Sequence, residues 1–171
     1  MEGYSNEEIK NLISCPKIIS EPPKKEMRSD RGSKRNDMRL QSSEGDLEFS
    51  VFMRINEDFS ENFSIGLDYS SQDERGTLCL LRFNGPHGGF MPDPPATESH
   101  FRYHIHRAKS ENIDAGLRAE HGAEVTDRYA SFRGALVIFL NEINVINALE
   151  YFPELSQPML PLNIQEKELE P

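Results

Sequence analysis

The sequence predicts an α+β domain in which an antiparallel meander sheet of about five strands is packed by an N-terminal and a C-terminal helix. Apolar residues recur at helical spacing close to the start of the chain and again over 131–143. Between these segments, apolar and polar residues alternate over short stretches, which clusters of polar residues and glycine separate. We therefore expect a single domain over 1–150, followed by a Pro-rich acidic tail over 151–171.

Two N-cap patterns predict the two helices. Ser5 and Glu8 have the spacing of a capping box, and apolar residues follow at helical intervals up to Pro16. Ser131 precedes the second apolar stripe, which runs to position 143 and is wide enough to cover one face of a sheet.

A basic segment separates the first helix from the predicted strands. Pro22 and Pro23 interrupt both helix and strand, so we expect residues 17–36 to form a basic loop or arm. The stretch 17–39 holds eight Lys or Arg residues against four Asp or Glu. Because the formal net charge of the whole chain is -10, this stretch is where the sequence favours a nucleic-acid contact.

Four strands are predicted from alternation before the first histidine. The first two form a hairpin that turns at residues 43–46, and the fourth is almost continuously apolar, which is typical of a strand in the middle of a sheet. The four strands are 37–42, 47–55, 62–69 and 77–83.

The fifth predicted strand, residues 100–107, carries the chemistry that the sequence offers. In an extended segment His100, His104 and His106 face one way together with Arg102. His87 follows the turn-forming residues 84–86, so four of the five histidines lie within 87–106. Three of them, His87, His104 and His106, are the candidate catalytic residues. The candidate substrate-binding residues are Arg82, Asn84, His100 and Arg102.

Two kinds of site fit these residue types. Without a cofactor, two imidazoles can act as general base and general acid while an arginine stabilises a phosphate, which is the equipment of an RNA-cleaving site. Alternatively, His87, His104 and His106 can hold a divalent metal such as zinc and leave one position open for water.

Several short segments also carry a resemblance to a known family. They are the run Leu80-Leu81-Arg82-Phe83-Asn84-Gly85-Pro86-His87, then His100 and His104-Ile105-His106, and then the helix start Ser131-Phe132. Over residues 77–140 this order resembles the TumE-type toxins of bacterial toxin–antitoxin pairs and related small bacterial proteins. In that family an arginine-bearing strand runs into Asn/Asp-Ala-Pro-His-His. The resemblance implies His87, His104 and His106 as site residues and a protein partner such as an antitoxin.

The leading hypothesis is therefore a toxin-like protein that acts on RNA, as an endoribonuclease or a translation inhibitor. One alternative is a non-enzymatic interaction or inhibitor protein, antitoxin-like or phage-encoded, and another is a metal-dependent hydrolase. We expect a cytoplasmic protein without a membrane span, because no apolar run reaches ~18 residues and no signal peptide is visible. Cys15 and Cys79 do not indicate a disulfide framework.

Overall fold

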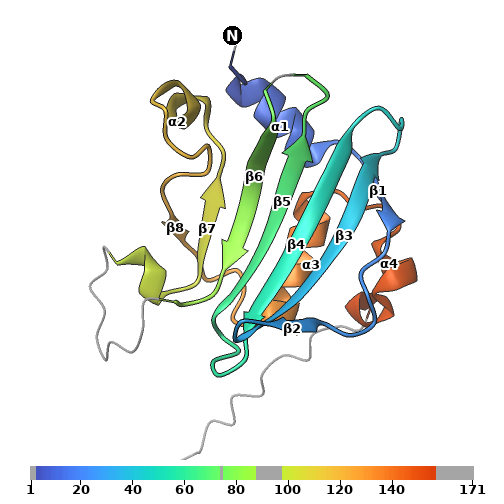
Figure 1. Cartoon of the computed structure of the whole chain (residues 1–171), viewed down its shortest axis with the longest axis vertical. Coiled ribbons are helices and arrows are strands. Elements are labelled where there is room, and N and C mark those ends of the chain that lie inside the picture. Colours follow the sequence, from blue (N-terminus) through green and yellow to red (C-terminus); the bar gives the residue numbers. More distant parts are fainter. Residues whose placement is uncertain (1–2, 74, 88–97, 157–171) are drawn as a thin grey trace, which may run out of the picture.

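The computed structural model describes residues 3–73, 75–87 and 98–156. Within these ranges the chain is an α+β protein with one antiparallel sheet of eight strands and four α-helices (Figure 1). The predicted fold class is confirmed, but the sheet is larger than the expected five strands. Residues 88–97, between His87 and His100, and residues 157–171 of the predicted tail lie outside the described ranges.

The sheet is a meander in which each strand of the main path pairs with its sequence neighbour, except where β2 branches off. Its order is β1-β3-β4-β5-β6-β7-β8, and β2 pairs with β3. The strands are β1 Lys17–Glu21, β2 Arg28–Asp30, β3 Ser33–Ser42, β4 Glu48–Asn56, β5 Phe63–Ser70, β6 Thr77–Asn84, β7 His104–Arg107 and β8 Glu124–Val125.

The helices begin where the sequence places their caps. Ser5 and Glu8 form the capping box of α1, and the Ser131 side chain accepts a hydrogen bond from the Gly134 amide at the start of α3. The helices are α1 Asn6–Ser14, α2 Ser110–Asp114, α3 Phe132–Glu142 and α4 Ala148–Tyr151, with 3-10 turns at Ser99–Phe101 and Pro153–Ser156. The ordered structure continues past the expected domain end at 150, because α4 runs to Tyr151 and Phe152 is buried.

The core lies between the sheet and α3. The Phe139 ring packs edge to face against Phe83 of β6, with 5.3 Å between the ring centroids. The Phe132 ring packs in the same way against Phe63 of β5, with 5.6 Å between the centroids. In Figure 1, α1, α3 and α4 lie behind the sheet, and the face toward the viewer carries no described helix. We call this second side the open face of the sheet.

The expected basic loop or arm at 17–36 is wrong, because the segment contains β1, β2 and the start of β3. The two prolines lie between β1 and β2, so they separate two strands and do not prevent either from forming. This segment places Arg28 directly opposite Arg35 in the ladder of β2 and β3. Arg28, Lys34 and Arg35 of this segment are thus held on strands of the sheet.

Lys17, the first residue of β1, has no exposed surface. Its ammonium group donates hydrogen bonds to the carbonyl oxygens of Ile13 at 2.8 Å, Cys15 at 3.0 Å and Ile143 at 3.2 Å. These carbonyls lie at the C-terminal ends of α1 and α3, where helices leave acceptors without internal partners and attract cations. One buried cation therefore ties the ends of two helices to the sheet.

Candidate functional site

The four histidines of the 87–106 window meet at the edge of the open face. In the ladder of β6 and β7, Asn84 pairs with His104 and Arg82 with His106, one position out of step with the buried Phe83. Side chains alternate across a strand, so these four residues point away from α3. The register of β6 and β7 thus brings Arg82, Asn84 and two histidines onto one face.

His87 reaches this group through a turn that only glycine permits. The Gly85 amide donates to the Phe63 carbonyl at 3.0 Å, and a Cβ atom at position 85 would lie 1.7 Å from the Glu61 carbonyl oxygen. The His87 amide then donates to the His100 carbonyl at 2.8 Å. This backbone bond sets the two histidines side by side.

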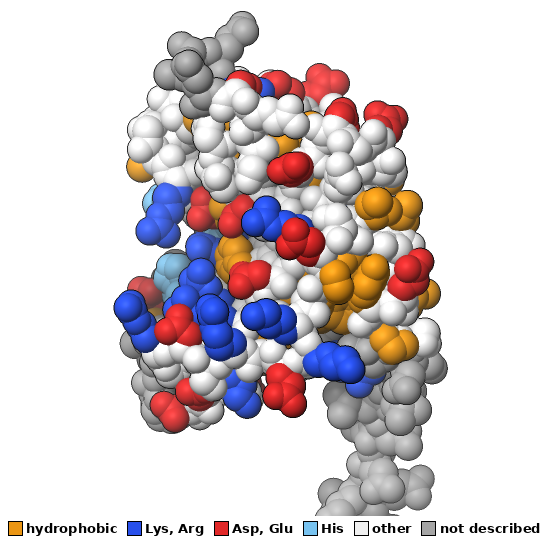
Figure 2. All heavy atoms as spheres, turned by 45° about the vertical axis from the view of Figure 1, so that its right-hand side comes forward, with side chains coloured by type: hydrophobic (Ala, Val, Ile, Leu, Met, Phe, Trp, Pro, Cys, Tyr) orange, Lys and Arg blue, Asp and Glu red, His pale blue; other side chains and the backbone are white. Residues whose placement is uncertain are grey.

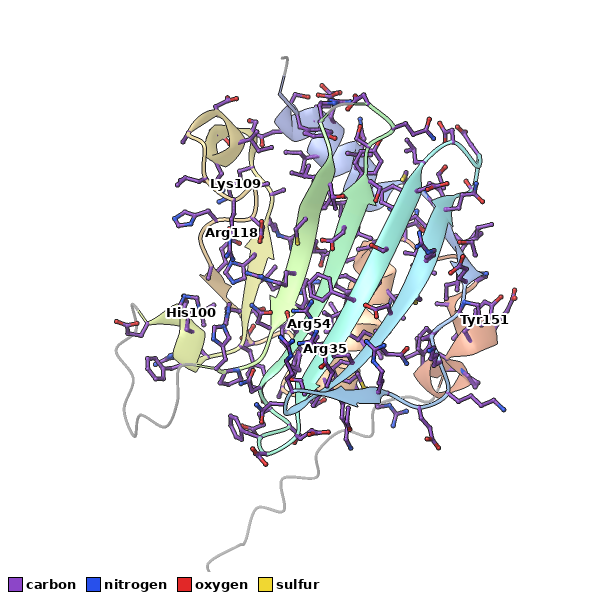
Figure 3. The ribbon with its side chains drawn as sticks, in the orientation of Figure 1. Arg35, Arg54, His100, Lys109, Arg118 and Tyr151 are labelled. Carbon is purple, nitrogen blue, oxygen red and sulfur yellow. The ribbon has the colours of Figure 1, made fainter. Side chains whose placement is uncertain are left out.

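The predicted strand over 100–107 is wrong in its first half. Residues Ser99–Phe101 form a 3-10 turn, and β7 begins only at His104. His100 nevertheless joins the cluster, because its ring centroid lies 4.8 Å from that of His87 and 5.2 Å from that of His104. Figure 3 shows His100 on this turn, beside the end of β7.

Three imidazole nitrogens of this cluster have the spacing of metal ligands. His87 Nε2 lies 3.3 Å from His104 Nε2 and 3.3 Å from His100 Nδ1, and the three nitrogens all lie within 4.8 Å of one another. Two nitrogens bound to a tetrahedral zinc ion at ~2.0–2.1 Å are about 3.3 Å apart. The trio differs from the expected His87, His104 and His106, because His100 takes the place of His106.

The hydrogen bonds of His104 place its unprotonated ring nitrogen in the cluster. Its Nδ1 lies 2.7 Å from the Arg102 carbonyl oxygen, which can only accept, so Nδ1 carries the proton. Metal-binding histidines commonly donate their other ring nitrogen to a backbone carbonyl in this way. Nε2 is then an acceptor, and the Asn84 amide donates to it at 3.1 Å.

Asn84 is a positioning residue in this structure. It is buried, and its amide oxygen accepts a hydrogen bond from the Ser64 hydroxyl at 2.7 Å while its nitrogen contacts His104. Both ends of the amide are thus engaged with protein atoms, and the expectation that Asn84 binds substrate stays a prediction.

His106 lies next to the trio, with one nitrogen bonded and the other without a partner. Its Nδ1 donates to the Gly122 carbonyl at 2.7 Å, with the Glu120 carbonyl also within 3.2 Å. Its Nε2 is buried and has no hydrogen-bond partner among the described residues. The ring centroid lies 5.0 Å from that of His104. A buried acceptor of this kind is costly unless something binds it.

Burial keeps His87, His104 and His106 neutral at physiological pH. Loss of solvent, with smaller contributions from the neighbouring imidazoles, lowers the pKa of His104 to about 4. Burial also lowers the pKa of His87 and His106, and Arg82 adds to both shifts through its positive charge. Neutral imidazoles carry the lone pairs that metal ligation requires.

The two predicted phosphate-binding arginines lie in different places. Arg82 is on the open face beside His106, with Nη1 3.8 Å from a Glu120 carboxylate oxygen and a buried Nε that has no partner in the described part of the chain. Arg102 lines a hollow of about 730 Å³ together with Tyr103 and Tyr129, and none of the four histidines lines that hollow. The structure thus brings only Arg82 to the cluster.

Supporting residues that the sequence analysis did not single out come from the polar stretch after β7. The Tyr129 hydroxyl lies 2.8 Å from the His104 carbonyl oxygen and 3.1 Å from that of Asn84, which holds the ends of β6 and β7 together. The carbonyls of Glu120 and Gly122 orient His106. No local pattern in the sequence marks these residues, because each acts through a contact far along the chain.

Comparisons of the chain with family models, with curated proteins and with solved structures find no match. The resemblance to TumE-type toxins therefore stays a prediction. No helix in the described ranges is both long and apolar enough to cross a lipid bilayer.

Proposed function

We propose that the protein is a metal-dependent hydrolase whose metal ligands are His87, His100 and His104. The observation that carries the proposal is the pair of 3.3 Å distances from His87 Nε2 to the other two ligand nitrogens. When no ion is bound, these neutral nitrogens hydrogen-bond to one another through their tautomeric protons, and a bound cation would take the place of those protons. His100 is exposed, so its ring can turn to complete the coordination.

A three-histidine site leaves one coordination position for water, whose pKa a bound zinc ion lowers to about 7. His106 Nε2, buried and unpartnered among the described residues beside the trio, is placed to take the proton from that water. The hydroxide oxygen then forms a bond to the electrophilic centre of the substrate, and the bond to the leaving group breaks. The proton held by His106 passes to the leaving group, and Arg82 stabilises the negative charge that develops.

The metal-free RNA-cleaving site expected from the sequence needs one imidazole that is protonated near neutral pH, to act as general acid. The lowered pKa values of His87, His104 and His106 mean that these three imidazoles begin the reaction neutral, as ligands or as a base that must first take a proton. Action on RNA as a toxin, with an antitoxin-like partner, stays a prediction of the resemblance. Growth and RNA integrity after expression of wild type or H104A/H106A test it.

Elemental analysis of protein purified without a histidine tag tests the metal centre. We expect about one equivalent of zinc or another divalent transition metal in the wild type, and none in His104→Ala. The matched control is His121→Ala, because His121 is exposed and its ring is not part of the cluster. A wild type that neither retains nor takes up metal, or a His104→Ala variant that binds it equally well, would overturn the proposal.

A further inference from the structure

A continuous row of polar side chains crosses the open face and ends at the histidines. The strand registers pair Arg35 with Arg54, Arg54 with Ser64, Ser64 with Asn84, and Asn84 with His104. Four steps of ~4.8 Å between strands make this row about 19 Å long. Arg28 of β2 extends it by one further strand, because it lies opposite Arg35.

A second row, two residues along each strand, runs beside the first and carries an aromatic ring. It pairs Asp37 with Phe52, Phe52 with Gly66, Gly66 with Arg82, and Arg82 with His106. A Cβ atom at Gly66 would lie 2.2 Å from Phe52 Cζ, so the glycine makes room for the ring to lie on the sheet. The Arg54 guanidinium carbon is 5.1 Å from the centre of that ring.

Two donors and one acceptor on these rows lack partners among the described residues. In the described part of the chain, four buried side-chain nitrogen or oxygen atoms have no hydrogen bond, and three of them lie on the two rows: Arg35 Nε, Arg82 Nε and His106 Nε2. Arg35 is paired through Nη1 with Asp30 at 3.1 Å, and Arg82 through Nη1 with Glu120 at 3.8 Å, so each guanidinium keeps its Nε–H for another acceptor. Phosphate oxygens are strong acceptors for such groups.

We propose that the open face binds a single strand of nucleic acid, with its phosphates along the arginine row, one base on Phe52 and a phosphodiester at the histidine centre. A row of guanidinium groups beside a sheet-borne aromatic ring is how sheet surfaces bind single strands without a duplex groove. Figure 3 shows Arg35 and Arg54 close together over β3 and β4, and Figure 2 shows basic side chains gathered beside a histidine, with acidic ones scattered around them.

The inference names the substrate class of the hydrolase and, for the cleavage step alone, rests on the proposed function. There water adds to phosphorus, one P–O ester bond breaks, and the proton from the water ends on the leaving oxygen. Binding along the rows needs no metal. The overall charge of -10 opposes non-specific binding of polyanions, so affinity must come from this face.

Fluorescence anisotropy of a labelled oligouridylate of about a dozen nucleotides, with the full chain in EDTA, tests binding. We expect Arg28→Ala/Arg54→Ala to weaken binding about tenfold or more and to reduce the salt slope by about two. The matched control is Lys10→Ala/Lys34→Ala, which removes the same charge. Lys34 is exposed and adjacent to Arg35 in β3, so it points to the opposite face, and Lys10 is exposed on α1.

Phe52→Leu isolates the stacking contribution. It should weaken binding roughly fivefold or more, whereas Phe59→Leu, at an exposed phenylalanine in the β4–β5 connection, should not. Equal weakening by both double variants, no binding at low salt, or stronger binding of a blunt duplex would overturn the inference. Tighter binding of the oligouridylate than of the matching oligothymidylate would support RNA as the natural strand. Equal binding would support an open face that contacts only phosphates and bases.

The two proposals fail separately. His104→Ala should lose the metal and keep the affinity for the oligonucleotide, and Arg28→Ala/Arg54→Ala should keep the metal and lose the affinity. Metal without oligonucleotide binding would leave the hydrolase in place and remove this substrate class. Oligonucleotide binding by a protein that holds no metal would support binding along the two rows and overturn the proposed metal centre.

Discussion

Lys17 and the inner histidines of the cluster, His104 and His106, are all buried away from water, yet their surroundings differ in one respect. Lys17 finds an acceptor for each of its three donors, all of them carbonyls at helix ends. In the histidine cluster, the ring nitrogens of His100 and His104 each lie 3.3 Å from His87 Nε2, and His106 Nε2 has no partner among the described residues. A buried group whose hydrogen bonds are complete stabilises the fold, whereas incomplete ones indicate a binding site.

The largest change in stability should come from removing the Lys17 ammonium group, whose hydrogen bonds are complete. Lys17→Met leaves three carbonyls at helix ends without a donor, so we expect a loss of about 3–5 kcal/mol in the free energy of unfolding. Urea denaturation followed by circular dichroism measures it. Lys34→Met, at an exposed lysine, should change stability by less than about 0.5 kcal/mol. A similar loss in both variants would show that the buried hydrogen bonds of Lys17 contribute no more to stability than an exposed lysine does.

The histidine cluster, whose hydrogen bonds are incomplete, should stabilise the protein when it binds a metal. Zinc at about a hundredfold excess over its dissociation constant should raise the free energy of unfolding of the wild type by about 2.7 kcal/mol. His104→Ala should show no such gain, and its metal-free form should stay folded, because the ring is not part of the apolar core. Thermal denaturation with and without zinc measures both. An equal gain in the two proteins contradicts the assignment of the ligands.

Asn84→Asp should increase the affinity for zinc while it lowers the stability of the metal-free protein. The new carboxylate would lie where the amide now contacts His104 Nε2, and it can serve as an additional ligand. We expect zinc to bind roughly tenfold more tightly while the metal-free protein loses stability, since the carboxylate is buried. Competition with a chelating dye measures affinity. Ser64→Ala removes the other partner of Asn84 without adding charge and should change zinc affinity little. Weaker zinc binding by Asn84→Asp than by the wild type would argue against a metal at this position.

The smallest effect concerns pH. Burial lowers the pKa of Lys17, so in the folded protein it loses its proton at a lower pH than in the unfolded chain, where the pKa is ~10.4. Between these two values the unfolded state binds more protons, so the Lys17 contribution to stability rises with pH, by at most about 1.4 kcal/mol per unit. Urea titrations of wild type and Lys17→Met at mildly alkaline pH measure it. A stability difference that narrows as pH rises contradicts this sign.

Local patterns were enough to predict the two helices with side-chain caps and the alternating strands β4 and β5, because caps and alternation depend on residues a few positions apart. They failed for residues 17–36. There the decisive partners of Lys17 include Ile143, 126 positions away, and prolines with lysines nearby are typical of loops. Sequence reasoning cannot see that a distant helix end will accept a buried cation.

The candidate site was predictable in the same partial way. Histidines on the expected neighbouring strands β6 and β7 could be expected to meet, and they do. The contribution of His100 was expected from a strand that is in fact a 3-10 turn, and it depends on one backbone bond from His87. The carbonyls that fix His104 and His106 could not be predicted, since any residue type supplies a carbonyl.

The tight passage of Gly85 under the Glu61 carbonyl has a consequence for tracing the ancestry of this protein. Any side chain at that position would push the turn off β5 and carry the first histidine with it. Descendants that keep the chemistry must therefore keep a glycine two places ahead of that histidine, whatever happens to the rest of the turn. A sequence pattern that combines this glycine with the three histidines at their present spacing should detect distant homologues whose overall sequence identity is too low to reveal them.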